Sequence, residues 1–231
     1  MQFLGSAFMI RDDTFMTARH VIETTPPPSQ EVAAAFTWAA ADPIIVGVTD
    51  VWTDSRSDIA VGRLTRVPVL HGHLTLAPDD LIFFDKDVHT IEYSDSVNRR
   101  EVPGEGVFMF VNPSHRKGNI VSSYLADTPP HRVPTDCYDL SYPALAGASG
   151  AAVFHADNGE VVGMIVANHD RYLMPSQVEP VIDRPGPTAS EGVYRLPMAQ
   201  AITARHLRDA LTQYDDWLDA QRAVDTRPNN G

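Results

Sequence analysis

Short apolar segments separated by turn residues follow one another along most of this chain of 231 residues. Such segments, bounded by glycine, proline and small polar residues, are typical of a β-barrel or β-sandwich. The strongest turn signal is Asn158-Gly159, which separates Val153–His155 from Val161–Ala167 and predicts a hairpin. Gly5–Ile10 and Thr14–Thr17 predict another hairpin near the N-terminus. We therefore expect an all-β fold.

Further segments divide the chain into two halves and a helix. Residues 18–23 predict a helical turn, residues 32–40, 44–52 and 58–64 predict strands, and residues 106–111 and 119–126 predict a hairpin. A polar, charged stretch from about 94 to 105 suggests a boundary, and a proline-rich stretch at 170–190 suggests a long loop. Apolar residues from Pro197 onward recur at helical spacing. The expected units are residues 1–97, 98–196, a helix at 197–224 and a tail at 225–231.

Charge and cysteine content exclude several classes of function. The net charge of −12, with 18 Lys and Arg against 30 Asp and Glu, is unlike that of a protein that binds nucleic acid or an anionic membrane. No apolar stretch is long enough to span a bilayer, and the first residues lack the features of a signal peptide. The single cysteine, Cys137, allows no intrachain disulfide. Together these features lead us to expect a cytoplasmic protein.

Three polar residues lie at the edges of strand-like segments, in the order His, Asp, Ser. His20 lies in Thr17-Ala18-Arg19-His20-Val21, Asp58 precedes Ile59-Ala60-Val61, and Ser149 lies in Gly147-Ala148-Ser149-Gly150. A serine hydroxyl needs a base to become a nucleophile at neutral pH, and a carboxylate fixes the tautomer of that base. Asp50 and Asp54 lie nearby, but Asp58 is preferred because an apolar strand follows it directly.

These motifs resemble those of the trypsin/chymotrypsin-like serine proteases, and within them the compact bacterial members. The resemblance extends from Gly5–Ile10 to Gly192-Val193-Tyr194, which resembles the final barrel strand. It implies two six-stranded antiparallel β-barrels and a C-terminal helix, with His20 and Asp58 on the first barrel and Ser149 on the second. It also implies that Ser149 attacks the scissile carbonyl, His20 transfers the proton and Asp58 orients the imidazole. The backbone N–H groups of Gly147 and Ser149 would form the oxyanion hole.

The resemblance further implies where a substrate binds. Val166-Ala167-Asn168 would pair with the substrate backbone, and Glu191 and Gly192 would lie beside the specificity pocket, with Glu191 favouring a basic side chain. The residue expected near the base of that pocket falls around Pro143, which carries no charge.

Two departures from the family pattern surround the nucleophile. Ala148 replaces the aspartate that receives a new N-terminus in digestive enzymes, so activation by such a salt bridge is not expected. Gly150-Ala151-Ala152 replaces the usual glycine- and proline-containing stretch.

The main interpretation is a serine endopeptidase that uses no metal or organic cofactor and acts on protein or peptide substrates. A regulatory partner would act through residues 127–146 or 170–190. A protease-like module that binds peptides without turnover, and a hydrolase acting on esters, are the alternatives. His71 and His73 have no third metal ligand at suitable spacing, and Cys137 has no histidine motif beside it, so we expect surface histidines and a buried thiol.

Overall fold

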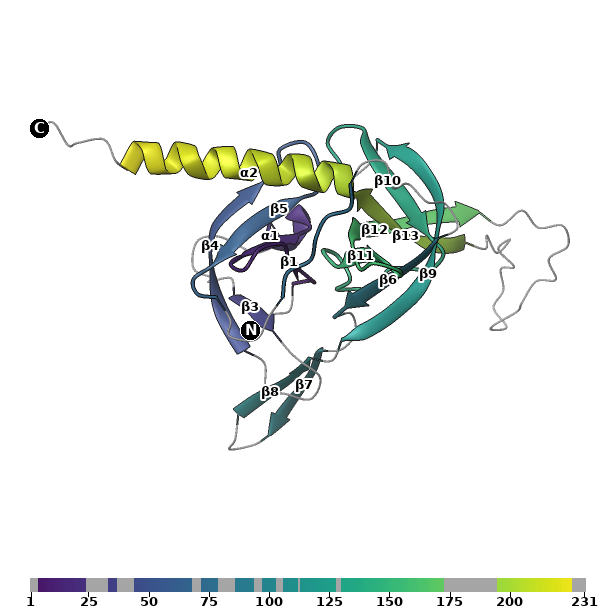
Figure 1. Cartoon of the computed structure of the whole chain (residues 1–231). Coiled ribbons are helices and arrows are strands. Elements are labelled where there is room, and N and C mark those ends of the chain that lie inside the picture. The colour runs from purple at the N-terminus through teal and green to yellow at the C-terminus, as the bar shows by residue number, and fades with distance from the viewer. Residues whose placement is uncertain are drawn as a thin grey trace, which may run out of the picture.

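The computed structural model describes residues 4–23, 33–36, 44–67, 72–78, 86–93, 97–102, 106–111, 113–127, 130–172 and 195–225. Within these ranges the protein is mostly β, with one closed six-stranded barrel, an open sheet and a C-terminal helix (Figure 1).

The N-terminal unit is an antiparallel sheet with the strand order β1-β2-β5-β4-β3. Its strands are β1 (Phe8–Met9), β2 (Thr14–Thr17), β3 (Ala33–Phe36), β4 (Ile44–Thr53) and β5 (Ala60–Leu64). The predicted β1–β2 hairpin is confirmed by the pairing of Phe8 with Met16. The predicted six-stranded first barrel is not found: among the described residues this sheet has five strands and does not close. One edge is β1, whose two residues are too short to carry a second ladder.

The second unit is a closed barrel in the order β10-β13-β12-β11-β6-β9. Its strands are β6 (Asp87–Glu92), β9 (Ser114–Ala126), β10 (Thr135–Leu140), β11 (Ala152–His155), β12 (Val161–Tyr172) and β13 (Arg195–Thr203). The hairpin predicted around Asn158-Gly159 is confirmed as β11–β12, and Gly159 has the positive φ, 73°, that such a turn requires.

Two expectations about the middle of the chain are corrected. Strand β6 lies before the expected boundary at residue 97, yet it pairs with β9 and β11 inside the closed barrel. Within the polar stretch, the described residues form β7 (Val97–Val102), which pairs with β8 (Gly106–Val111) in a separate hairpin. The hairpin predicted between 106–111 and 119–126 is therefore wrong, because β8 pairs with β7, whereas β9 pairs with β6 and β10.

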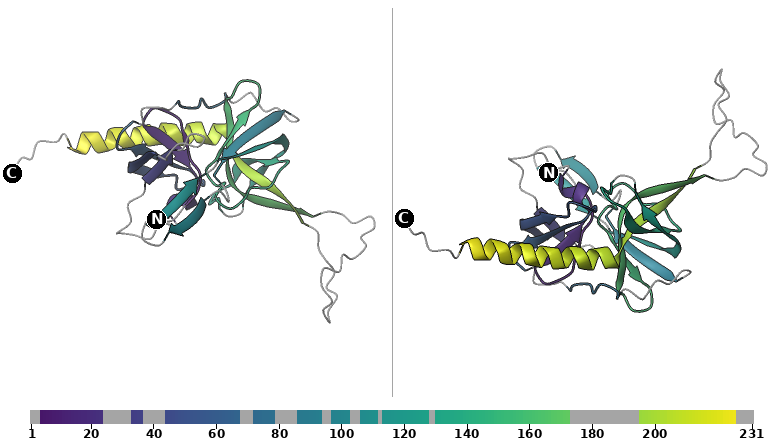
Figure 2. Two further views of the ribbon diagram at one scale, coloured as in Figure 1. Left: turned by 90° about the horizontal axis from the view of Figure 1, so that it is seen from below. Right: turned by 90° about the horizontal axis from the view of Figure 1, so that it is seen from above.

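The C-terminal helix begins later than predicted. Residues from Arg195 to Thr203 form β13, and helix α2 spans Ala204–Asp225. Met198-Ala199-Gln200-Ala201 would be acceptable in a helix, but pairing with β12 on one side and β10 on the other overrides that preference. The helix runs from the barrel along the N-terminal unit (Figures 1 and 2). No helix in the described part of the chain is long and apolar enough to cross a membrane.

Helix α2 joins the two units through one apolar face. Leu207, Ala210 and Tyr214 are fully or almost fully buried at the three- and four-residue spacing of a helix face. They belong to the same cluster as Met16 of β2 and Ile202 of β13. A second cluster fills the barrel interior and includes residues of every barrel strand (Val88, Ile120, Leu140, Val153, Ile165, Ala201). The cluster shared by helix α2, β2 and β13 lies between the two units. The segments that carry His20, Asp58 and Ser149 are close to this interface.

Candidate active site

Strand pairing brings the histidine and aspartate motifs together. Thr17, the last residue of β2, pairs with Ala60, the first residue of β5, so the residues just beyond them are neighbours. Helix α1 (Arg19–Glu23) begins directly after this point and carries His20.

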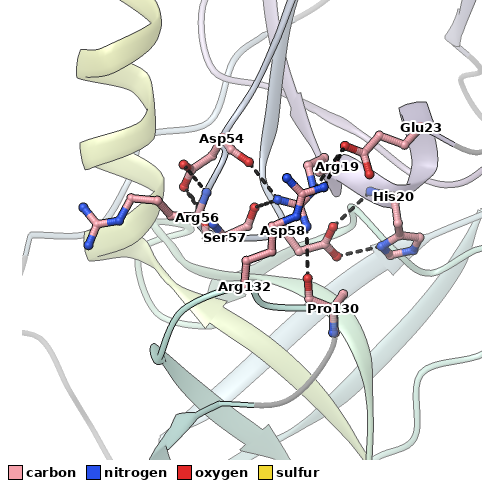
Figure 3. Close-up of polar contacts among 9 residues, drawn as sticks. All are labelled: Arg19, His20, Glu23, Asp54, Arg56, Ser57, Asp58, Pro130 and Arg132. Carbon is pink, nitrogen blue, oxygen red and sulfur yellow. Dashed lines mark hydrogen bonds and ion pairs between the residues drawn. The ribbon is translucent and has the colours of Figure 1, made fainter.

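Asp58 faces His20 with both carboxylate oxygens. The His20 Nδ1 atom lies 2.6 Å from Asp58 Oδ2, and the His20 backbone N–H donates to Asp58 Oδ1 at 2.9 Å (Figure 3). Asp58 is fully buried, whereas the His20 side chain is 37% exposed. The carboxylate therefore holds one ring nitrogen from the protein side, and the other nitrogen remains available to accept a proton.

The neighbouring aspartates have different partners. Asp54 accepts hydrogen bonds from the backbone N–H groups of Arg56 and Ser57, at 2.9 and 3.1 Å, and from the Ser57 hydroxyl. It therefore shapes the loop that presents Asp58 (Figure 3). Asp50 lies 3.6 Å from Arg63 in an ion pair. Of the three aspartates considered from the sequence, Asp58 is the one in contact with His20.

A buried arginine lies directly behind this pair. Arg19 is only 4% exposed, and its guanidinium donates to the carbonyl oxygens of Asp54 and Ser57 at 2.8 Å each and of Pro130 at 3.0 Å (Figure 3). Its backbone N–H donates to the Asp58 carbonyl at 3.2 Å. Arg19 thus ties the loop before Asp58 to the segment that leads into β10. Its importance was missed in the sequence, where an arginine between a strand and a histidine carried no recognisable signal.

Ser149 lies in a turn with two left-handed glycines. Gly147 has a φ of 93° and Gly150 a φ of 88°, a region that side chains with a Cβ rarely adopt. A Cβ at Gly150 would lie 2.1 Å from the Ser6 carbonyl oxygen and 2.3 Å from Thr17 Oγ1. Gly150 therefore packs directly against the end of β2, next to the motif that carries His20.

Hydrogen bonds through Ser6 attach this turn to the N-terminal unit. The Ser6 backbone N–H donates to the Ser149 carbonyl at 2.9 Å, and its hydroxyl donates to the Gly147 carbonyl at 2.8 Å. Thr17 Oγ1 donates to the Ser6 carbonyl at 2.7 Å. The structure thus places the turn of Ser149 beside the His20 segment, although no hydrogen bond joins the side chains of Ser149 and His20 in the described residues. Ser6 and Thr17 were not identified as site residues from the sequence, since small polar residues in a hairpin are common.

Comparison with known proteins identifies the family of this chain. Residues 5–164 match the family described as trypsin-like peptidase domain, which is more than half of the chain. The chain belongs to the trypsin-like peptidase family. A comparison with curated protein sequences finds no match.

Solved structures of proteases share the fold of this trypsin-like domain. The HtrA-type protease AlgW with a decapeptide is 16% identical with a TM-score of 0.63, and the match covers 92% of this chain and 52% of AlgW. The Rv3671c protease from M. tuberculosis is 20% identical in its active form, with a TM-score of 0.58, covering 90% of this chain and 72% of that one. A serine-to-alanine mutant of Rv3671c in an inactive form is 19% identical with a TM-score of 0.59, covering 92% and 82%. The chain thus spans about half the length of the HtrA-type protease.

The backbone donors expected at the trypsin-like oxyanion hole lie in the same turn. The backbone N–H of Ala148 donates to the Leu145 carbonyl and that of Gly150 to the Ile165 carbonyl, at 2.9 and 2.8 Å. The N–H groups of Gly147 and Ser149 donate to no other residue in the described part of the chain. The N–H groups of Ala148 and Gly150 therefore help to hold the turn, whereas those of Gly147 and Ser149 have no acceptor among the described residues.

The expected substrate-binding strand is the middle of β12. Backbone pairing with the turn reaches Ile165, and from Ala167 onward β12 continues to pair with β13 on its other side. Val166 is buried, whereas Asn168 is exposed and its side chain bonds to the backbone of Ala144. The other two expected binding residues, Glu191 and Gly192, lie outside the described residues.

Cys137 is a buried thiol, as expected, but a histidine does lie beside it. Burial raises the pKa of Cys137 to about 12, and its sulfur lies 3.5 Å from His131 Nε2. Burial also lowers the pKa of His131, against a weaker opposing effect of Asp58. Both shifts favour the neutral forms, so this pair does not supply the thiolate and imidazolium of a cysteine nucleophile. No group of three or more potential metal ligands is found among the described residues.

Proposed function

We propose that this chain is a serine endopeptidase in which Ser149, His20 and Asp58 form the catalytic triad. The observation that carries the proposal is the buried Asp58 carboxylate bonded to a partly exposed His20, with the Ser149 turn fastened beside them through Ser6. Membership of the trypsin-like peptidase family supports the same chemistry. The decapeptide bound to the similar HtrA-type protease favours a polypeptide as the substrate class.

The reaction proceeds in two halves. His20 takes the proton of the Ser149 hydroxyl as the oxygen attacks the scissile carbonyl, and Asp58 stabilises the imidazolium that forms. The N–H groups of Gly147 and Ser149 donate to the oxyanion, each contributing roughly 3 kcal/mol to the stability of the transition state. His20 then returns the proton to the leaving amine, which leaves an acyl group on Ser149. Water, deprotonated by His20, releases the acid and restores the serine.

The departures near the nucleophile are compatible with this mechanism. Ala148 is fully buried, and Ala151 and Ala152 are 1% and 4% exposed, so their methyl groups pack into the protein core. The extra Cβ at Ala151 is therefore accommodated beside the turn.

A regulatory partner is a further part of the proposal. Because residue 148 is alanine, no acidic group at this position can form a salt bridge with a newly formed N-terminus. Restraint of the activity would therefore come from contacts of a partner with residues 127–146 or 170–190. The bond from Arg19 to the Pro130 carbonyl connects the first of these segments with the Asp58 loop. A contact that moves Pro130 would thereby reach the aspartate loop.

Digestion of an unstructured protein such as denatured casein tests this function. The full chain without a partner is expected to produce peptides from it slowly, and Ser149→Ala is expected to produce none. Ser141→Ala on the same connecting segment serves as a control that keeps the wild-type activity. Cleavage by Ser149→Ala would contradict the proposal. If the wild type binds casein peptides and neither cleaves them nor labels with a serine-directed phosphonate, it acts as a binding module. Rapid cleavage by the purified chain would refute the need for a partner.

A further inference from the structure

The Asn168 side chain forms a two-bond link to the segment that leads into Ser149. Its Nδ2 amide group donates to the Ala144 carbonyl at 2.8 Å, and its Oδ1 atom accepts from the Ala144 N–H, also at 2.8 Å. A side-chain amide thus takes the place that a backbone peptide group would have in an antiparallel ladder. It satisfies both polar groups of Ala144, although Asn168 itself is exposed.

This link is one of two places at which the segment that carries Ser149 is joined to β12. Next to Ser149, the Gly150 N–H donates to the Ile165 carbonyl at 2.8 Å and the Ile165 N–H donates to the Ala151 carbonyl at 2.9 Å. Residues 144–150 and residues 165–168 are therefore joined at both ends, by backbone bonds beside Ser149 and by the Asn168 amide farther away.

On the function proposed above, a substrate residue would have to fit between these two segments. If a peptide pairs with β12 at residues 166–168 and holds its scissile carbonyl at Ser149, the side chain on the acyl side of that bond lies toward these two segments. A flat ring between two walls needs about 7 Å, twice the contact distance of roughly 3.5 Å between non-bonded atoms. The Asn168 amide joins the two segments here, and a large side chain between them would have to break both of its hydrogen bonds to Ala144.

We propose that Asn168 is a specificity-determining residue that restricts the residue on the acyl side of the scissile bond to small side chains such as glycine, alanine and serine. The proposal rests on the function proposed above. It predicts a small side chain at this position, where Glu191, which lies outside the described residues, suggested a basic one.

Paired peptide p-nitroanilides that end in alanine or phenylalanine measure this preference on the full chain. The wild type is expected to favour the alanine substrate in kcat/KM. Asn168→Ala, which removes the amide but keeps a Cβ, is expected to reduce that preference about tenfold or more, since two hydrogen bonds no longer oppose entry. Asn158→Ala is the matched control, because Asn158 also bonds through its amide to a neighbouring backbone N–H and carboxylate but lies on the β11–β12 turn. Its preference should equal that of the wild type.

A second readout needs no turnover and separates this proposal from the proposed function. Tripeptides with free carboxyl ends, Ala-Ala-Ala and Ala-Ala-Phe, are titrated into Ser149→Ala with and without Asn168→Ala. Binding of the alanine peptide to Ser149→Ala, with the phenylalanine peptide gaining affinity only when Asn168 is also replaced, supports the proposal even in an inactive enzyme. Equal binding of both peptides to Ser149→Ala, binding of neither, or an unchanged preference in Asn168→Ala overturns it.

Discussion

Replacing the buried Arg19 by methionine should strongly destabilise the protein. The guanidinium is 4% exposed and bonds to three carbonyl oxygens, those of Asp54, Ser57 and Pro130. Methionine preserves most of the aliphatic volume but leaves these carbonyls without a donor. An unsatisfied buried polar group costs about 1–3 kcal/mol, and relief from burying a charge offsets part of the sum. We therefore expect the free energy of unfolding to fall by about 3 kcal/mol.

Urea denaturation followed by tryptophan fluorescence measures this loss. Arg132→Met is the matched control, since Arg132 is 58% exposed in its side chain and lies 3.6 Å from Glu23, the same carboxylate that Arg19 approaches at 3.5 Å. An exposed ion pair contributes about 1 kcal/mol or less. A loss below about 1 kcal/mol in Arg19→Met, or an equal loss in both variants, would refute the claim that the carbonyl bonds of Arg19 hold the Asp58 loop.

Three further predictions concern single buried positions. Gly150→Ala should abolish labelling of the nucleophile and lower the melting temperature, because its methyl group would meet the Ser6 carbonyl at 2.1 Å and Thr17 Oγ1 at 2.3 Å; a variant that folds and labels normally would contradict the packing of this turn. Cys137 should not react with a thiol reagent in the native protein at mildly alkaline pH, since burial raises its pKa to about 12, and should react once per chain after unfolding; native reaction would show that the thiol is accessible. Burial lowers the pKa of His131 from its usual 6.5, so the unfolded state takes up a proton first as the pH falls, and stability is lost below about pH 6.5. His131→Gln should reduce this loss in denaturation curves measured at several pH values. An unchanged dependence of stability on pH would contradict this prediction.

Much of the arrangement of the histidine and aspartate motifs could be predicted from local sequence patterns. Thr17 and Ala60 end and begin strands that pair in register, so the short motifs around them carry the geometry of His20 and Asp58. The hairpin turned at Asn158-Gly159 was equally predictable, because the positive φ of its turn depends on the single residue Gly159. Such features depend on neighbours in the sequence, which a single chain displays directly.

Features that depend on residues distant in the sequence could not be predicted from it. The Met198–Ala201 stretch has helical preference, and only its two partner strands make it part of β13. The assignment of β6 to the barrel likewise depends on β9 and β11. Arg19 looks like a surface residue until the carbonyl of Pro130 is brought to it from the other unit. Asn168 was expected to offer only its backbone, whereas its side chain is what reaches Ala144.

The most direct test of the central claim is the intact mass of the full chain after reaction with a small fluorophosphonate. The account predicts one adduct on the wild type, located on Ser149 by peptide mapping, and none on Ser149→Ala. Asp58→Asn should slow the reaction by several orders of magnitude, because the imidazole would lose the carboxylate that fixes its tautomer, while Asp50→Asn should leave the rate near that of the wild type. A folded wild type that gains no adduct, or an adduct that persists in Ser149→Ala, would contradict the account.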